Sequence, residues 1–286
     1  MIQKIVVTGA NGQLGSEIGA ISGVSPHTFI FTDIDTLDLT SEKETLAFLE
    51  KHAPGVIINC AAYTAVDKAE DDWDTALKLN ADIPSMLGEY CNQSGCKIIH
   101  ISTDYVFSGD KPIPLSEEDE TVPKSIYGQS KLKGEQALAG NKNAAIIRTS
   151  WLYSHYGKNF VKSMVGLMAE KEELRVVFDQ VGSPTYAGDL AGAIIKMVEA
   201  GPSEFTPGIF HYSNEGVASW YDLAVEIADL TGSGCKIVPI ETKDYPLPAP
   251  RPVYAVLNKE KIKNQFQLTI PHWRSSLKRC IEKIKP

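Results

Sequence analysis

The chain has 286 residues, of which 43% are apolar and 22% charged, and its formal net charge is −8. This composition excludes extensive disorder and suffices for one large or two modest domains. The acidic balance argues against nucleic acid or an anionic membrane as a partner, and no stretch approaches the roughly 18 apolar residues of a membrane span.

The five cysteines are odd in number and lack Cys-x-x-Cys spacing. We expect reduced, mostly buried thiols and no metal site. The N-terminus opens on a strand-like apolar run without signal-peptide architecture. The expected location is therefore cytoplasmic.

Short apolar runs alternate with longer amphipathic stretches in the first half of the chain. The runs predict strands at Lys4–Thr8, Thr28–Thr32, Gly55–Asn59, Lys97–Ser102 and Ala144–Arg148. The intervening stretches predict a helix from Gln13 and helices over Ser41–His52 (capped by Ser41), Trp73–Ser94 and Tyr127–Leu138. Nearly continuous apolar strands separated by helices are typical of a parallel sheet buried on both faces, so the predicted class is α/β with a doubly wound, Rossmann-type sheet.

The alternation loosens after Arg148. Helices are predicted over Asn159–Glu170, Asp189–Glu199, Trp220–Leu230 and about Arg274–Ile284, with a strand at Leu174–Phe178. We expect residues 1–150, with part of about 186–214, to form the Rossmann domain. Residues of about 151–185 and 215–286 are expected to form a smaller, partly discontinuous C-terminal lobe.

Three glycines, Gly9, Gly12 and Gly15, lie between the first predicted strand and the first predicted helix. In that context they predict a dinucleotide site: the first permits a tight turn, the second admits the pyrophosphate, and the third lets helix and strand pack closely. Gln13 and Leu14 lie inside the same turn. The spacing is Gly-x-x-Gly-x-x-Gly, not Gly-x-Gly-x-x-Gly, and a purely structural turn is the alternative.

Acidic residues follow the second predicted strand. Asp33 is placed to accept hydrogen bonds from the adenosine ribose and to repel a 2′-phosphate, which favours NADH over NADPH. Asp35 competes for this role. Asp38, beside Leu39, is either an acceptor for the adenine amino group or a solvated residue at a helix entry. The remaining cofactor contacts are expected at the end of the third strand, from Ala62, Tyr63 and Thr64.

Tyr127 and Lys131 lie four residues apart on a predicted helix, so the phenol and the ammonium can face one pocket. A nearby cation stabilises a phenolate, which lowers the pKa of the tyrosine and suits it to proton exchange. Thr103 ends the fourth predicted strand and supplies a third polar group. The alternative is that Tyr127 and Lys131 lie on an exposed helical turn and form no site, which is the expectation for a Tyr-xxx-Lys pair taken alone.

These features resemble those of an extended short-chain dehydrogenase/reductase. Five further segments make the chain similar to the dTDP-4-dehydrorhamnose reductase family over nearly its whole length: Ala61–Glu70, Ser102–Phe107, Arg148–Tyr153, Gly157–Phe160 and Asp179–Thr185. The resemblance implies reduction of the C4 ketone of dTDP-4-dehydro-L-rhamnose by NADH or NADPH, for synthesis of a polysaccharide precursor. The C-terminal lobe would then bind the nucleotide sugar.

The resemblance also assigns roles to residues. Tyr127 would donate the proton, Lys131 would hold the nicotinamide ribose and lower the tyrosine pKa, and Thr103 would bond near the substrate carbonyl. Asp104 would contact the sugar.

For two further residues the resemblance implies a role in the site, and an ordinary structural role is the alternative. Trp151 would line the deoxysugar, or pack in the core. Arg251 would bind the diphosphate, or pair with a carboxylate. The stretch after Arg251 departs from the family pattern at Ala255 and Asn258, which puts nucleotide contacts there in doubt. Magnesium and a homodimer are implied for some members, without residues to place them here.

Two other functions remain open at this point. One is a different nucleotide-sugar reductase or an epimerase, which would retain tightly bound NAD. The other is a non-catalytic regulatory subunit of the same fold. Such a subunit need not keep Thr103, Tyr127 and Lys131 together, as this chain does.

Overall fold

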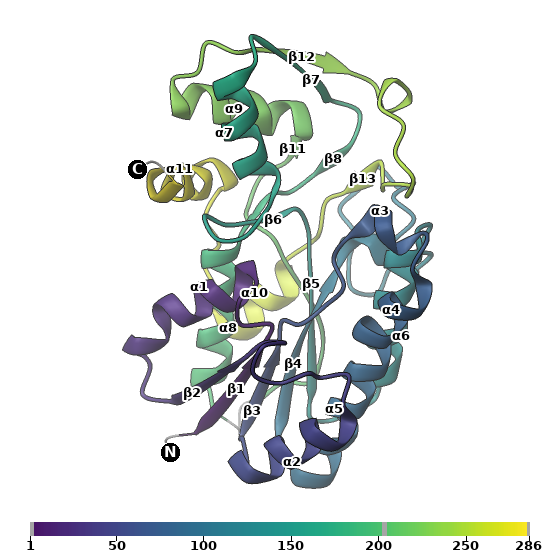
Figure 1. Cartoon of the computed structure of the whole chain (residues 1–286), viewed down its shortest axis with the longest axis vertical. Helices are drawn as coiled ribbons and strands as arrows, with labels where there is room; N and C mark the ends of the chain where they lie inside the picture. Colours follow the sequence, from purple (N-terminus) through teal and green to yellow (C-terminus); the bar gives the residue numbers. More distant parts are fainter. Residues whose placement is uncertain (1–2, 202–204, 285–286) are drawn as a thin grey trace.

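The computed structural model describes residues 3–201 and 205–284. Its main feature is a six-stranded sheet in which all strands are parallel (Figure 1). In spatial order the strands are β10 (Gly208–Tyr212), β5 (Ala144–Thr149), β4 (Lys97–Thr103), β3 (Val56–Asn59), β1 (Lys4–Thr8) and β2 (Thr28–Thr32). The predicted Rossmann-type class is confirmed, and the five predicted strands are all present.

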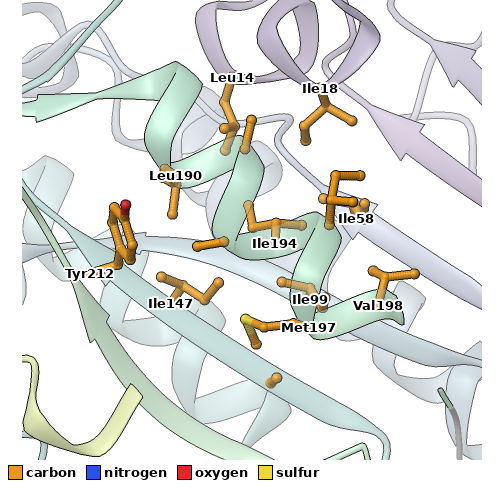
Figure 2. Close-up of a cluster of buried hydrophobic side chains, with 14 of the residues drawn as sticks. Leu14, Ile18, Ile58, Ile99, Ile147, Leu190, Ile194, Met197, Val198 and Tyr212 are labelled. Carbon is orange, nitrogen blue, oxygen red and sulfur yellow. The ribbon is translucent and has the colours of Figure 1, made fainter. Parts of the chain in front are cut away.

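Helices cover both faces of this sheet because successive strand residues point to opposite sides. Ile5 and Val7 face one layer, whereas Val6 faces the other. The first layer contains α1 (Gln13–Ile21), α8 (Ala187–Glu199) and α10 (Glu260–Phe266). The second contains α2 (Glu42–His52), α5 (Ile83–Ser94) and α6 (Ile126–Leu138). Figure 2 shows the core under α8, where Leu190 and Ile194 meet Ile147 of the sheet.

The second half of the chain supplies β10, α8 and α10 to the large sheet and its cover. The sequence predicted α8 but not β10, which pairs with β5 at the sheet edge through Phe210 opposite Ile147. Phe266 of α10 packs edge-on against Phe210. These contacts place β10, α8 and α10 against the sheet formed by the first 150 residues.

The predicted helix Trp73–Ser94 is interrupted. It consists of α4 (Trp73–Leu77), a π-helical turn at Lys78–Asp82, and α5. The side chain of Asn80, within the π turn, bonds the backbone N–H and carbonyl of Tyr63 at 2.9 and 3.1 Å. Pro84, at the start of α5, has no N–H to continue a regular ladder. Ser41 is the N-cap residue of α2 as predicted, but its side chain makes no capping hydrogen bond.

The rest of the chain forms a smaller lobe around short sheets. Its strand groups are β7 (Glu173–Val177) with β12 (Lys236–Ile240), β11 (Ala218–Ser219) with β8 (Val181–Gly182) and β13 (Tyr254–Ala255), and β6 (Leu152–Tyr153) with β9 (Thr185–Tyr186). Its helices are α7 (Phe160–Glu170), α9 (Trp220–Thr231) and α11 (Trp273–Ile284). Short helical segments elsewhere are α3 (Val66–Ala69), η1 (Ser22–Val24), η3 (Asp104–Val106) and η4 (Thr242–Asp244). No helix in the described ranges is long and apolar enough to traverse a membrane.

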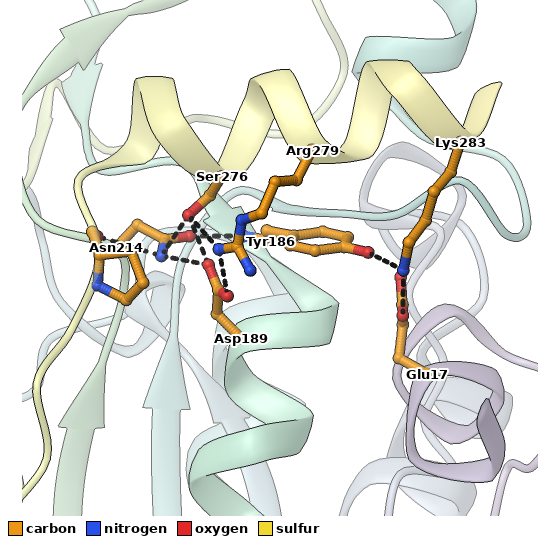
Figure 3. Close-up of polar contacts among 8 residues, drawn as sticks. Glu17, Tyr186, Asp189, Asn214, Ser276, Arg279 and Lys283 are labelled. Carbon is orange, nitrogen blue, oxygen red and sulfur yellow. Dashed lines mark hydrogen bonds and ion pairs between the residues drawn. The ribbon is translucent and has the colours of Figure 1, made fainter. Parts of the chain in front are cut away.

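A polar network joins α11 to the layer of α1 and α8 (Figure 3). Asp189 of α8 is almost buried and accepts bonds from Asn214 at 2.8 Å and from Ser276 and Arg279 at 2.5 Å each. Lys283 donates to the hydroxyl of Tyr186 at 2.9 Å. Because Ser276, Arg279 and Lys283 all lie on α11, this helix is held by polar contacts as well as by its apolar face.

We expect Asp189→Ala to lower the free energy of unfolding by about 2–3 kcal/mol, since three donors would lose a shared buried acceptor. Chemical denaturation monitored by circular dichroism measures this loss. Glu173→Ala is the control, because Glu173 pairs with Lys236 at the surface and should change the value by less than about 1 kcal/mol. Equal effects of the two substitutions would contradict the assigned role of Asp189.

Candidate active site

A cavity of about 820 Å³ runs along the carboxyl ends of the parallel strands, beneath the smaller lobe. Loops that follow β1, β2, β3 and β4 line it on one side, and residues 149–153 and 157–161 with Trp220 and Leu223 line it on the other. The chain leaves β1 toward β2 on one side and returns to β3 on the other, so this edge contains the topological switch point. Ligands of doubly wound sheets bind at such a crevice.

The glycine turn has the geometry that a dinucleotide requires. Gly9 has φ +64°, and a Cβ there would lie 2.6 Å from the backbone nitrogen of Ala61. A Cβ on Gly15 would collide with the carbonyl oxygen of Gly9. Gly12 is the N-cap of α1, which leaves first-turn N–H groups free to bind phosphate oxygens. Gly9, Gly12, Gln13 and Leu14 line the cavity, whereas Gly15 acts behind it through packing.

The predicted ribose acceptor lies where the sequence placed it. Asp33 lines the cavity, and its two carboxylate oxygens accept the backbone N–H groups of Asn11 and Ile34 at 2.8 Å each. Its competitor Asp35 is not part of the lining. Asp38 and Leu39 also line the cavity, and hydrogen bonds from Thr40 lower the pKa of Asp38.

Thr103, Tyr127 and Lys131 converge in the cavity, each less than 10% exposed. The Lys131 ammonium donates to the Ile101 carbonyl at 2.6 Å, while the Tyr127 hydroxyl lies beside the Thr103 side chain. Burial raises the pKa of Tyr127 to about 12 and lowers that of Lys131 to about 8. In this arrangement burial dominates the pKa of Tyr127 and the Lys131 ammonium contacts a carbonyl, so the lowering of the tyrosine pKa by Lys131 stays a prediction.

Helix α6, which carries Tyr127 and Lys131, is anchored at both ends. Ser125 caps it by accepting the N–H of Gly128 at 3.1 Å. One turn beyond Lys131, the buried Glu135 forms a bidentate ion pair with Arg148 of β5, at 2.9 Å from Nε and 2.7 Å from Nη2. No local sequence pattern predicts this pair.

A buried polar chain runs under the cavity from β1 to Lys131. Thr8 donates to Asn59 at 2.7 Å, and Asn59 lies 3.0 Å from one ring nitrogen of His100. The other ring nitrogen is 3.5 Å from the Lys131 ammonium. Burial and Lys131 both lower the pKa of His100, which keeps the ring neutral. This chain orients Lys131 from below.

Asp104 lies beside Thr103 and is 2% exposed. One of its oxygens accepts the Thr103 hydroxyl at 3.1 Å, and the other is buried without a hydrogen-bond partner among the described residues. Burial raises the pKa of Asp104 to about 7, against the opposing effect of the Thr103 bond. A carboxyl in this state can be neutral in part at physiological pH.

An aromatic stack forms the wall opposite the sheet. The rings of Trp151 and Trp220 lie 3.6 Å apart and nearly parallel, and both line the cavity. Trp151 has φ +46°, an uncommon conformation for a bulky residue, and the absence of a side chain at Gly182 makes room for its indole. The sequence indicated Trp151 but assigned Trp220 only to a helix start, since no local pattern pairs residues so far apart.

The segment Gly157–Phe160 closes the cavity over the glycine turn. The Asn159 amide donates to the Gln13 side chain at 2.9 Å, and its oxygen caps α7 by accepting the N–H of Lys162 at 3.0 Å. Lys158 adds a cation to the lining. The sequence of this segment resembles the family, but no local pattern predicted a role for its residues.

Two predicted contacts lie outside the lining. Arg251 forms a bidentate pair with Asp67, at 2.5 and 2.7 Å, which is the carboxylate alternative that the sequence left open. The Tyr63 hydroxyl points to Asp72 at 3.4 Å, although its neighbours Ala62 and Thr64 do line the cavity. The described part of the chain holds no cluster of three or more His, Cys, Asp or Glu side chains that fits a metal ion.

A dinucleotide turn, a buried Thr-Tyr-Lys set and an aromatic wall define an NAD(P)-dependent oxidoreductase of the short-chain dehydrogenase/reductase type. The model of the family "RmlD substrate binding domain" matches residues 3–285. The chain belongs to this family.

Named relatives match over nearly their full length. The chain is 40% identical to a dTDP-4-dehydrorhamnose reductase of Sinorhizobium fredii, over 97% of this chain and 96% of the relative. A crystal structure of a dTDP-4-dehydrorhamnose reductase from Clostridium acetobutylicum superimposes with a TM-score of 0.92 at 43% identity, covering 98% of each chain. That of the Bacillus anthracis enzyme in complex with NADP gives 0.93 at 36% identity, covering 99% of this chain and all of the other.

We expect Gly9→Ala to abolish saturable binding of reduced dinucleotide and to destabilise the protein, because alanine meets both a positive φ and the Ala61 backbone. Titration of NADH fluorescence and thermal unfolding measure the two effects. Gly19→Ala on α1, the helix that follows the turn, is the control: its Cβ would lie 3.8 Å from the ring of Phe31, an ordinary contact, so binding should persist. Wild-type affinity in Gly9→Ala would refute the assignment of the turn.

Proposed function

We propose that this chain reduces the C4 ketone of dTDP-4-dehydro-L-rhamnose to give dTDP-L-rhamnose, with NADH or NADPH as the reductant. The observation that carries the proposal is the convergence of Thr103, Tyr127 and Lys131 beside a dinucleotide turn. Support comes from relatives at about 40% identity that bear the name dTDP-4-dehydrorhamnose reductase and match from end to end. The product is a precursor for polysaccharide synthesis.

The N-terminal turn of α1 would hold the pyrophosphate, Asp33 the adenosine ribose, and Lys131 the nicotinamide ribose. When bound, the nicotinamide supplies the hydride that C4 accepts. Tyr127 gives its proton to the C4 oxygen as negative charge develops there. With a pKa of about 12 the phenol stays protonated at neutral pH, so it is ready to act as an acid.

The Trp151–Trp220 stack would cover the apolar face of the deoxysugar and keep water from the hydride path. Thr103 would bond the substrate near its carbonyl. We also propose that residues 1–150, with part of about 186–214, bind the dinucleotide. The lobe of about 151–185 and 215–286 would bind the nucleotide sugar.

We expect the purified protein to oxidise NADH or NADPH only when dTDP-4-dehydro-L-rhamnose is added. The absorbance of the reduced nicotinamide measures this oxidation. Tyr127→Phe should lower kcat by about 10²–10⁴-fold, with cofactor affinity nearly unchanged, because only the proton donor is lost. Normal turnover of this variant would remove Tyr127 from the mechanism. Purification with stoichiometric bound NAD would favour the epimerase alternative.

We propose that NADH is the preferred cofactor, although a relative was crystallised with NADP. The Asp33 carboxylate would face a 2′-phosphate, and Lys131 and Lys158 are the only lysine or arginine side chains in the described cavity lining. Asp33→Ser should lower the ratio of KM for NADPH to KM for NADH roughly tenfold or more by removing this repulsion. Asp35→Ser, outside the lining, is the control and should leave the ratio unchanged. A ratio that responds equally to both would contradict the proposal.

A further inference from the structure

Thr103 lies between Tyr127 and Asp104, and its hydroxyl is hydrogen-bonded to Asp104. Its hydroxyl oxygen accepts the backbone N–H of Tyr105 at 3.2 Å and lies 3.1 Å from the nearer oxygen of Asp104. On its other side lies the Tyr127 hydroxyl, whose pKa the Thr103 hydroxyl lowers. A hydroxyl has one donor and two acceptor positions, so one position of Thr103 remains for the Tyr127 hydroxyl.

The same atoms support two directions of donation. With Asp104 ionised, Tyr127 donates to Thr103 and Thr103 donates to Asp104. With Asp104 protonated, the carboxyl donates to Thr103 and Thr103 donates to Tyr127, which leaves the phenol hydrogen free to face the cavity. The second direction is the one that a proton donor requires.

The surroundings of Asp104 favour its neutral form. The carboxyl is 98% buried, and its second oxygen has no hydrogen-bond partner among the described residues, which penalises a negative charge. The groups packed near it are Tyr105 of η3 and Tyr127 of α6, both neutral phenols. Arg251 contacts Tyr105, but its charge is paired with Asp67.

We propose that Asp104 supplies a proton to Tyr127 through the Thr103 hydroxyl, in place of the proton that Tyr127 gives to the substrate. This inference rests on the proposed reductase function and extends it. As the C4 oxygen takes the Tyr127 proton, Tyr127 takes the Thr103 proton and Thr103 takes the Asp104 proton. One O–H bond breaks and one forms at each link, so the negative charge ends on Asp104, and a solvent proton restores the carboxyl after product leaves.

The relay makes kcat/KM depend on protonated Asp104 in the free enzyme. Since the pKa of Asp104 is raised to about 7, kcat/KM for the sugar should fall about tenfold per pH unit above that value. Asp104→Asn should lower kcat about 10²-fold and abolish this limb between pH 6 and 8. Thr103→Val should remove the same fall of kcat/KM with pH. Thr103→Ser, which keeps the hydroxyl, should retain it.

The double variant Asp104→Asn, Thr103→Val should be no slower than the slower single variant, because both changes interrupt one chain. If Asp104 only binds the sugar, Asp104→Asn will raise KM while leaving kcat and the pH limb intact. That result overturns the relay. Failure of the wild-type protein to oxidise NADH or NADPH with the dTDP-sugar would instead refute the proposed function.

A measurement without substrate tests Asp104 on its own. A carboxyl whose folded pKa is raised from about 4 to about 7 destabilises the folded state progressively between those pH values, and by a constant amount above them. The Tm of Asp104→Asn should therefore rise relative to wild type from pH 4 to pH 7 and stay level above. Asp110→Asn is the control, because Asp110 is an exposed carboxylate whose pKa is lowered by Lys124. The difference in Tm between this variant and wild type should stay constant from pH 5 to pH 8. A constant difference for Asp104→Asn over that range contradicts the proposal.

Discussion

The buried ion pair between Glu135 and Arg148 is the interaction on which the catalytic geometry depends. Both side chains are about 3% exposed, so each has lost its hydration. The fork of the guanidinium meets both carboxylate oxygens, and Ser102 donates to one of them at 2.5 Å, which offsets the desolvation cost. Glu135 lies four and eight residues beyond Lys131 and Tyr127, on the same face of α6. A shift of the helix that displaced the phenol would therefore break the pair.

Two glycines set how closely α6 approaches its neighbours. A Cβ on Gly134 would collide with the carbonyl oxygen of Asn80, and one on Gly128 with that of Tyr105. Each glycine costs about 1 kcal/mol of helix propensity, so the close approach is retained at the expense of local stability. Asn80 lies in the π turn, so this turn presents the backbone carbonyl that meets the helix that carries Tyr127.

The sequence predicted the parts of this site that have a local cause. The Gly9–Gly15 turn was predictable because positive φ and close backbone approach demand glycine at fixed offsets, and the five strands were predictable from apolar runs. Contacts between distant segments were not, since no local pattern encodes them: Trp220 against Trp151, Arg251 against Asp67, and the orientation of Lys131. The spacing of Tyr127 and Lys131 gave a shared face, but the direction of each side chain depended on the Ile101 carbonyl and on Thr103.

Burial gives the ionisable groups of the cavity a common tendency toward neutrality. It raises the pKa of Tyr127 and Asp104 and lowers that of Lys131, each in the direction that disfavours charge. With a pKa of about 8, Lys131 is a group whose charge an anion nearby stabilises. A bound dinucleotide carries negative charge, so it favours the ammonium, and by reciprocity the ammonium favours the dinucleotide. Lys131 thereby couples cofactor binding to the charge state of the site, while Tyr127 remains an acid throughout.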